Sequence, residues 1–302
     1  MKIAVTGASG LIGSRLCTFL KNDGHQVLRL LRPQSVPEES SGADILTWEP
    51  VAGEVNKKAL EGLNAVVHLV GENVAQRWTE PVKKRITGSR LRSTDFLCKT
   101  LASLASPPEV LISASAIGFY GDRKEEPVDE SSSRGQGFLA ELCQKWEAAA
   151  SPAAEAGIRV VNLRTGIVLS TAGGALAKML PPFQLGAGGI LGSGEQYMSW
   201  ITMTDTMEAI KFLIQNKILR GPVNLVAPNP VTNHDFTKAL GKALGRPTFC
   251  PVPAAVARMV MGDMADEMLL TGAKVLPSKL EAAGYKFRYP DIDSGLKEAL
   301  EK

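Results

Sequence analysis

Short apolar runs alternate with longer amphipathic stretches along most of the chain. The apolar runs have the length and composition of buried strands, and the amphipathic stretches repeat their apolar residues at helical spacing. The pattern predicts strands near residues 3–5, 26–31, 45–48, 64–71, 159–169 and 223–226, and another that starts at 110. It predicts helices near residues 11–20, 56–60, 78–104, 137–150 and 206–215. This alternation is typical of an α/β fold with a Rossmann-type, doubly wound parallel sheet.

The pattern changes after residue 169. Residues 173–194 are dense in glycine yet too apolar for a disordered linker, so we expect a loop that wraps a site. Helical spacing returns at residues 233–244, 254–260 and 292–300. We therefore expect an NADP-binding Rossmann domain over residues 1–169, rejoined by 201–228. Residues 170–200 and 229–302 then form a smaller C-terminal α+β substrate lobe.

Three glycines follow the first strand and precede the first helical stretch. Gly7 suits a tight turn, Gly10 lets backbone N–H groups approach a pyrophosphate, and Gly13 lets the helix pack closely on the strand. The anion then lies at the positive end of the helix dipole. The loop and first helical turn therefore predict cofactor contacts from the three glycines and from Ser9, Leu11 and Ile12.

The end of the second strand indicates which dinucleotide binds. A carboxylate at this point bonds the ribose of NAD, whereas an arginine accommodates a 2′-phosphate. The strand ends at Leu31-Arg32, and the nearest acids are Asp23 before it and Glu38 well after it. Leu31 and Arg32 therefore predict an NADP(H) site, with Ser9 as a second phosphate contact. The alternative is a solvated arginine after a strand.

The buried strand near residues 64–71 supplies a second wall for this site. It ends in Leu69, Val70, Gly71 and Glu72. Ligands of open α/β sheets bind beyond the carboxyl ends of the strands. These four residues are therefore predicted to face the cofactor.

Composition excludes several other classes of function. The 302 residues carry 34 basic and 31 acidic side chains, so the net charge of +3 gives no electrostatic case for nucleic acid. The four cysteines form no CxxC pair, and the three histidines are scattered, so we expect free thiols in a reducing compartment and no metal. The sequence offers neither a leader nor a membrane-length apolar run, so we expect a cytoplasmic protein that binds no membrane.

The chain resembles the extended short-chain dehydrogenase/reductase superfamily, and within it the epimerase-like family that carries the inherited label of cell-division inhibitor. The matching motifs lie at residues 6–13, 68–73, 77–79, 88–90, 113–121, 146–149, 163–166, 173–176, 199–201 and 227–230. The resemblance implies a Rossmann domain, NADP(H) in the glycine loop and a C-terminal substrate lobe. It also implies cofactor contacts from Arg90 and Arg164, which lie in matched motifs. A homodimer through the helices near 78–104 and 137–150 is common among such proteins, and the residues alone leave the oligomeric state open.

The resemblance fails at the residues that carry the chemistry. Enzymes of the superfamily use a Tyr with a Lys four residues later, and the helix near 137–150 has Leu139 and Cys143 at those positions. Ser115 and Tyr120 on the preceding strand and turn are the substitutes that the chain offers for proton transfer. Tyr120 could instead serve only to pack the turn. Cys143 is either a reactive thiol or a buried free cysteine.

Two functions remain open at this point. One is an NADP(H)-dependent, epimerase-like oxidoreductase that acts on an unknown small molecule. The other is a catalytically silent NADP(H)-binding sensor or interaction protein. Trp200, the glycine segment at 186–194 and Arg164 are expected at the cleft, with structural roles as the alternative.

Overall fold

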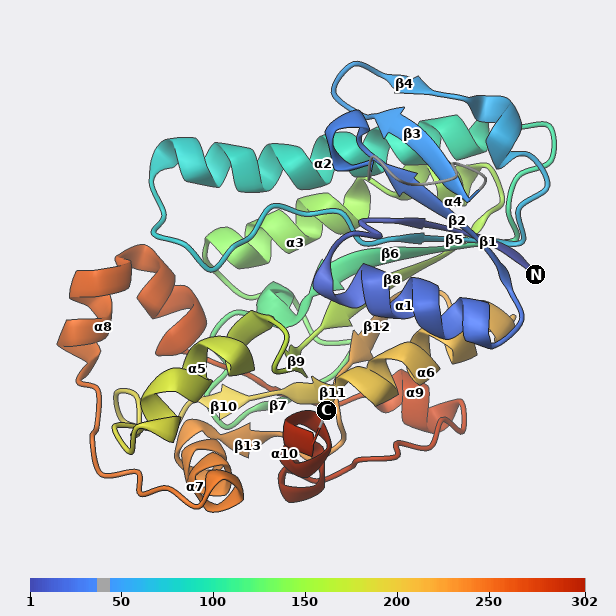
Figure 1. The fold of residues 1–302 in the computed structure, drawn as a ribbon. Helices are drawn as coiled ribbons and strands as arrows, with labels where there is room; N and C mark the ends of the chain where they lie inside the picture. The colour runs from blue at the N-terminus through green and yellow to red at the C-terminus, as the bar shows by residue number, and fades with distance from the viewer. Residues whose placement is uncertain (37–43, 302) are drawn as a thin grey trace.

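A computed structural model describes residues 1–36 and 44–301 and is organised around one eight-stranded sheet (Figure 1). All of its neighbouring strands run parallel except the last pair, which is antiparallel. In spatial order the strands are β12 (Gly221–Leu225), β8 (Arg159–Thr165), β6 (Val110–Ala116), β5 (Ala65–His68), β1 (Lys2–Thr6), β2 (Gln26–Leu31), β3 (Ile45–Glu49) and β4 (Glu54–Val55). This confirms the predicted doubly wound α/β fold. Glu38 lies outside the described residues.

Helices cover both faces of the sheet (Figure 1). On one face α1 (Leu11–Asn22) and α6 (Met203–Gln215) bury apolar side chains such as Leu16 and Ile210 against the strands. On the other face lie α2 (Glu80–Ala102), α3 (Phe138–Ala148) and α4 (Ser151–Glu155), with Leu97 and Ala153 in a second apolar core. The central strands are buried on both sides, which explains their nearly continuous apolar sequence.

Short strand pairs and helices, most of them from the C-terminal half, lie below the carboxyl edge of the sheet (Figure 1). The strand pairs are β9 (Ile167–Leu169) with β11 (Trp200–Thr202), β10 (Tyr197–Met198) with β13 (Val231–Thr232), and β7 (Pro127–Val128) with β14 (Lys274–Val275). The helices are α5 (Gly174–Gln184), α7 (Asn233–Leu244), α8 (Ala254–Met261), α9 (Ser278–Ala282) and α10 (Ile292–Glu301), with a π-helical turn at Ala265–Leu269. Trp200 and Phe236 are fully buried in the core of this region.

The predicted single strand over 159–169 is wrong, because the chain changes sheets at Gly166. A Cβ built on Gly166 would lie 2.5 Å from the carbonyl oxygen of Ser199, so the backbone makes a close approach there. β8 stays in the main sheet and β9 pairs with β11 instead. One continuous apolar run therefore forms two strands in different sheets, a division that the periodicity of apolar residues does not reveal.

The expected loop over the glycine-dense segment is also wrong in its first part, where α5 forms. Leu176, Leu180 and Phe183 recur at helical spacing and are buried, which stabilises the helix despite its glycines. Pro181 and Pro182 lie in its last turn, where each lacks the N–H that would bond to the preceding turn. Packing of one apolar face therefore overrides the weak local propensity.

Within the described residues, none of the helices is both long and apolar enough to cross a membrane. The same part of the chain contains no cluster of His, Cys, Asp and Glu that could hold a metal ion.

Candidate functional site

The glycine loop between β1 and α1 is closed by contacts that only glycine permits. Gly7 has a φ of +67°, and a Cβ there would lie 2.7 Å from the carbonyl oxygen of Leu69. A Cβ on Gly13 would lie 2.2 Å from the carbonyl oxygen of Gly7. Gly10 N–H donates to that same Gly7 oxygen over 2.9 Å. The turn predicted at Gly7 and the close packing predicted at Gly13 are therefore confirmed.

The N-terminus of α1 points its first amide groups out of this loop. Gly10 is the N-cap and has no side chain to bond them. The amides of Leu11, Ile12 and Gly13 fall in the first turn, where a helix has no internal acceptor for its N–H groups. The loop is therefore an uncapped, positively polarised helix end of the kind that binds phosphate.

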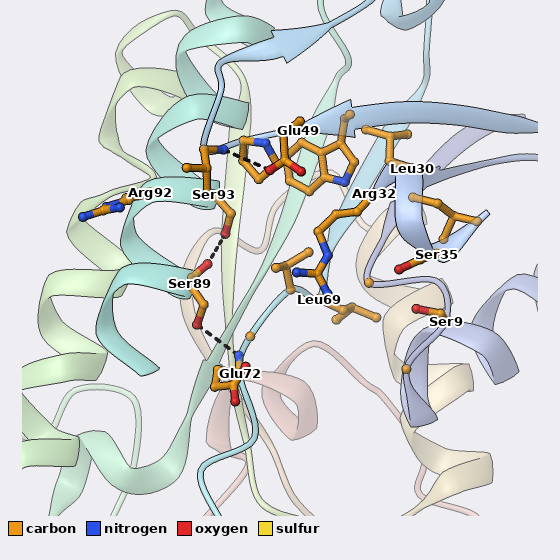
Figure 2. A pocket seen from close by; sticks show the side chains of 18 of the residues that line it. Ser9, Leu30, Arg32, Ser35, Glu49, Leu69, Glu72, Ser89, Arg92 and Ser93 are labelled. Carbon is orange, nitrogen blue, oxygen red and sulfur yellow. Dashed lines mark hydrogen bonds between the residues drawn. The ribbon is translucent and has the colours of Figure 1, made fainter. Parts of the chain in front are cut away.

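A cavity of about 280 Å³ opens above this loop (Figure 2). Its walls come from the loop, the ends of β2, β3 and β5, and one face of α2. It is lined by Gly7, Ser9, Gly10, Leu30, Leu31, Arg32, Ser35, Trp48, Glu49, Pro50, Val51, Leu69, Val70, Gly71, Glu72, Gly88, Ser89, Arg92 and Ser93.

Arg32 places a positive charge in this cavity. Figure 2 shows its guanidinium reaching into the pocket toward Leu69, with Ser9 and Ser35 to one side, whereas Arg92 points away. The carboxylate of Glu49, on β3, also lines the cavity and accepts a hydrogen bond from Val51 N–H at 3.3 Å. The pocket therefore offers a cation, a carboxylate and two hydroxyls beside the phosphate loop.

Below the loop, a buried hydrogen-bonded network fixes the strand ends. His68 Nδ1 lies 2.7 Å from the Thr6 hydroxyl, and His68 Nε2 lies 3.0 Å from the Thr94 hydroxyl. Trp146 Nε1 donates to the same Thr94 oxygen over 3.0 Å. Burial lowers the pKa of His68 to about 3, so the ring is neutral at physiological pH. This network positions the loop and is closed to a substrate.

A second network surrounds both residues proposed for proton transfer. Ser115 donates to Glu147 Oε1 at 2.7 Å, and Arg164 donates to both Glu147 oxygens, through Nε at 2.8 Å and Nη2 at 2.9 Å. Arg164 Nη1 also donates to the Tyr120 hydroxyl at 3.0 Å, and that hydroxyl donates to Asn224 Oδ1 at 2.7 Å. Ser115 and Arg164 are each 4% exposed and Tyr120 is fully buried.

These contacts favour packing as the role of Tyr120. Burial raises the pKa of its phenol to about 12, although the charge of Arg164 opposes the rise. The hydroxyl has partners on both sides and faces Asn224 rather than a cavity. Its assignment as a proton donor therefore has no geometric support. Ser115 has a carboxylate partner, but it too is buried and does not line the cavity.

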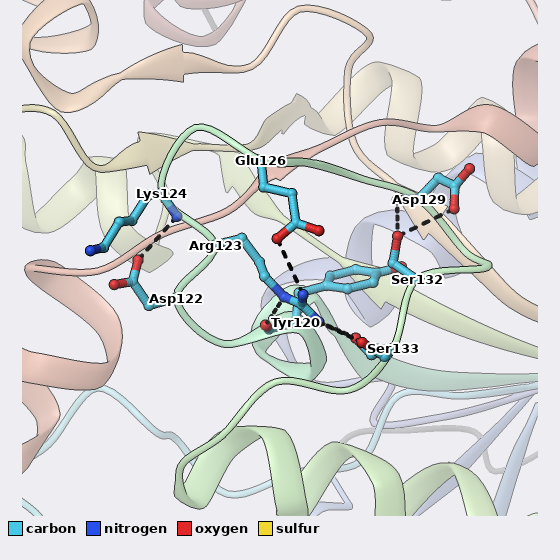
Figure 3. Close-up of polar contacts among 8 residues, drawn as sticks. All are labelled: Tyr120, Asp122, Arg123, Lys124, Glu126, Asp129, Ser132 and Ser133. Carbon is cyan, nitrogen blue, oxygen red and sulfur yellow. Dashed lines mark hydrogen bonds and ion pairs between the residues drawn. The ribbon is translucent and has the colours of Figure 1, made fainter.

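The turn after Tyr120 is held by Arg123 (Figure 3). Arg123 donates from Nε to the Tyr120 carbonyl oxygen at 3.0 Å and from Nη2 to the Ser133 hydroxyl at 3.0 Å. Its Nη1 lies 3.3 Å from Glu126. These bonds close the segment between β6 and α3 and fix the backbone of Tyr120.

At the start of α3, the positions of the superfamily's Tyr and Lys hold a half-buried leucine, Leu139, and a buried cysteine, Cys143. A Cβ on Gly118 would lie 3.2 Å from Leu139 Cβ and 3.9 Å from Cys143 Sγ. Burial raises the pKa of the Cys143 thiol to about 12, so Cys143 is a buried thiol and not a reactive thiolate. Glu267, from the π-helical turn, accepts the N–H groups of Phe138 and Leu139 at 2.9 Å each.

The structure brings together most, but not all, of the predicted cofactor residues. Nine of them line the cavity: Gly7, Ser9, Gly10, Leu31, Arg32, Leu69, Val70, Gly71 and Glu72. Leu11, Ile12, Gly13, Arg90 and Arg164 do not line it, and Trp200, expected at the cleft, is fully buried. Sequence reasoning missed Ser35, Trp48 and Glu49, which reach the cavity from the η1 turn (Pro33–Ser35) and β3. The short strand predicted at 45–48 was the signal for Trp48 and Glu49, and Ser35 had none.

Comparison with known proteins identifies two matching family models. The model described as "NAD dependent epimerase/dehydratase family" matches residues 3–225. A model described as a domain of unknown function, DUF1731, matches residues 252–299.

Relatives match along nearly the whole chain. The chain is 45% identical to the epimerase family protein Mb2239 of Mycobacterium bovis over 295 residues, which cover 97% of this chain and 96% of that protein. It is 36% identical to the human epimerase family protein SDR39U1 over 304 residues, which cover 99% of this chain and 100% of that protein.

Solved structures agree with this likeness. The crystal structure of human SDR39U1 (isoform 2) with NADPH superposes with a TM-score of 0.90 at 35% identity and covers 100% of both chains. A nucleoside-diphosphate sugar epimerase from Corynebacterium glutamicum superposes with a TM-score of 0.79 at 35% identity, covering 99% of this chain and 58% of that one.

Proposed function

This chain belongs to the NAD-dependent epimerase/dehydratase family, and from that premise we propose that it is an NADP(H)-binding, epimerase-like oxidoreductase. Its small-molecule substrate is unknown. Arg32 carries the cofactor assignment, since a cation at the end of β2 beside the phosphate loop suits a 2′-phosphate. The human relative that was crystallised with NADPH supports the same choice.

The residues present fit this cofactor. The glycines at positions 7, 10 and 13 place no side chain over the helix end, so a pyrophosphate can reach the amides of α1. Arg32, Ser9 and Ser35 supply donors for the 2′-phosphate. When bound, the cofactor supplies or accepts a hydride.

Proton transfer is assigned in this proposal to Ser115. Its hydroxyl donates a hydrogen bond to Glu147 at 2.7 Å. When the Ser115 oxygen accepts the proton of a carbinol hydroxyl group, the Glu147 carboxylate is placed to accept the proton that Ser115 gives up. Arg164 orients that carboxylate through two bonds and is a positioning residue. Tyr120 anchors Arg164 from the other side.

Cofactor titration tests the first part of this proposal. Wild-type protein is titrated with NADPH and NADH by nicotinamide fluorescence, and NADPH is expected to bind more tightly. Arg32→Glu should weaken NADPH about tenfold to a hundredfold while leaving NADH nearly unchanged, because one charged phosphate contact is lost. If wild type and Arg32→Glu have the same ratio of NADPH to NADH affinity, Arg32 does not bind the 2′-phosphate.

The second candidate is a silent NADP(H)-binding sensor or interaction protein. Leu139 and Cys143 favour it, because they leave the usual positions of Tyr and Lys without titratable oxygen or ammonium groups. A turnover screen with NADP(H) over sugar nucleotides and small carbonyl compounds distinguishes the two. Turnover that is lost in Ser115→Ala supports the oxidoreductase, whereas binding without any hydride transfer supports the sensor.

A further inference from the structure

A second cavity, of about 430 Å³, lies on the main sheet away from the phosphate loop. It is enclosed by the end of α3, by α4, by the first half of β8 and by the start of β12, at one edge of the sheet (Figure 1). The first cavity lies at β2, β3 and β5, and the two linings have no residue in common. The second cavity therefore has the volume of a small-molecule site and is separate from the proposed cofactor site.

The floor of this cavity contains a polar side chain that lacks a partner. Asn162, on β8, lines the cavity, and its Oδ1 is buried without a hydrogen bond within the described residues. Ser113 stands beside it in register on β6, is 1% exposed, and has an Oγ with no partner in the same part of the chain. Each lies two residues after a member of the core beneath α4, Leu111 or Val160, so both side chains face α4.

Such unpaired groups are rare, because buried polar atoms of folded proteins nearly always have a partner. A half-turn of the Asn162 amide exchanges its oxygen and its nitrogen, so it can offer the cavity an acceptor or a donor. The floor therefore has hydrogen-bonding capacity that the described chain does not use.

The wall beside α3 adds a carboxylate that also has capacity to spare. Glu147 lines this cavity and not the first one. Its Oε1 accepts from Ser115 and Arg164, whereas its Oε2 accepts from Arg164 alone. An ionised carboxylate has about four acceptor sites, so Oε2 can accept a further bond. Hydroxyl groups, which both donate and accept, suit the Glu147 carboxylate and the Asn162 amide together.

The mouth of the cavity is positively charged. Arg220 is exposed there, and its side chain forms neither a hydrogen bond nor an ion pair with the described residues. Lys279 Nζ donates to the Arg220 carbonyl oxygen at 3.0 Å, which fixes the backbone. Burial lowers the pKa of Arg159, which also lines the cavity, and the nearby charge of Arg220 lowers it further. The Nη groups of Arg159 donate to uncharged carbonyl oxygens at and after the end of α6. Glu109 acts on Arg159 in the opposite sense but is paired with Lys217 at 4.0 Å, so the mouth keeps a positive charge.

The spacing between floor and mouth sets the length of a ligand. The register of β12 on β8 places Arg220 level with Val160, two residues or roughly 7 Å along the strand from Asn162. We propose that this cavity binds the phosphate ester of a small sugar or polyol, with the phosphate at Arg220 and hydroxyl groups at Asn162 and Glu147. The fork of donors on an arginine matches the oxygens of a phosphate. The site is independent of the proposed function.

Calorimetric titration tests this site on the NADPH-saturated protein, in which the phosphate loop is occupied. The probes are ribose 5-phosphate and glycerol 3-phosphate, with ribose, glycerol and inorganic phosphate as their separate parts, all at constant ionic strength. At least one ester should bind tenfold or more tightly than any of the parts. If NADPH does not bind, which counts against the proposed function alone, the same titrations are made without it, because the two cavities share no residue.

Two pairs of variants locate the binding. Arg220→Gln removes the charge at the mouth, and Arg246→Gln removes an equal charge from an exposed arginine that does not line the cavity. Ala154→Trp fills the cavity from the exposed side of α4, and Ala156→Trp adds the same ring outside the lining. Arg220→Gln and Ala154→Trp should each weaken binding of the ester tenfold or more, while the two controls keep the wild-type affinity. All four changed side chains are exposed, and melting temperatures check that the variants are folded.

Three results would overturn the proposal. Wild-type protein that binds neither ester has a cavity that holds water only. An ester affinity no higher than that of inorganic phosphate means that the floor contributes nothing. Equal affinities of wild type, Arg220→Gln and Ala154→Trp mean that the ester binds elsewhere.

Discussion

The ion pair between Glu147 and Arg164 joins α3 to β8 beneath the site, and it allows a quantitative test. Its two hydrogen bonds, of 2.8 and 2.9 Å, link side chains that are 12% and 4% exposed. Removing one partner of such a buried pair costs about 3–5 kcal/mol. With a melting shift of roughly 2 °C per kcal/mol for a chain of this size, Glu147→Gln should melt about 6–10 °C lower than wild type.

A double-mutant cycle isolates the pair from its neighbours. Arg164→Met also removes the bond to Tyr120 and the stacking on Phe119, whose ring centroid lies 3.4 Å from the guanidinium. These losses cancel in the comparison of Glu147→Gln, Arg164→Met and the double variant. Denaturant unfolding should give a coupling energy of about 3 kcal/mol. A coupling below about 1 kcal/mol would show that the pair behaves like a solvated surface pair and would refute the reasoning.

Gly13→Ala should abolish NADPH binding and lower the melting temperature, because the added Cβ would lie 2.2 Å from the Gly7 carbonyl oxygen. The control is Gly24→Ala, which also changes a glycine (φ of +80°, with open space around it) but leaves the loop intact. NADPH binding by Gly13→Ala would contradict the loop geometry. Burial lowers the pKa of His68 to about 3 in the folded protein, against about 6.5 in the unfolded chain, so unfolding takes up a proton below pH 6.5. The free energy of unfolding should therefore fall by up to about 1.4 kcal/mol per pH unit as the pH drops from 6.5 to 3. In denaturant titrations His68→Gln should remove this contribution to the pH dependence, and an unchanged pH dependence would be contrary evidence. Cys250 is exposed and Cys143 buried with a pKa near 12, so iodoacetamide at pH 8 should label Cys250 in the native protein and Cys143 only after unfolding, as read by peptide mass.

The local pattern of the sequence was enough to predict the sheet and the phosphate loop. Strand runs such as Ile3–Val5 and the glycine spacing depend on contacts between near neighbours in sequence. Helix α7 also has the predicted bounds, because local residues begin and end it: the Thr232 side chain accepts from Asp235 N–H, and Gly245 adopts the left-handed conformation after the last turn. The strand change at Gly166 and helix α5 could not be predicted, because the deciding contacts, with Ser199 and with the buried core around Trp200, lie far along the chain.

The candidate site divides in the same way. The positions of Arg32, Gly7 and Gly10 at the cavity were accessible to sequence reasoning, because they follow directly from the ends of strands. The environment of Ser115 and Tyr120 was not, because it is built by Glu147, Arg164 and Asn224 from three other elements. Hydroxyl residues at a strand end indicate chemistry, but their hydrogen-bond partners decide whether the hydroxyl is available.

The bond between Glu267 and the first amides of α3 has a consequence for biosynthesis. It joins residues 129 positions apart, and β14 pairs with β7 across a similar stretch of chain. Contacts between residues so far apart in sequence form late in folding, because the entropy cost of closing the loop between them comes before the contacts can stabilise the protein. In the nascent chain, α3 therefore lacks its bonds to Glu267 and β7 lacks its partner strand until Glu267 and β14 have left the ribosomal exit tunnel. A nascent chain stalled before this point should be the species that chaperones hold.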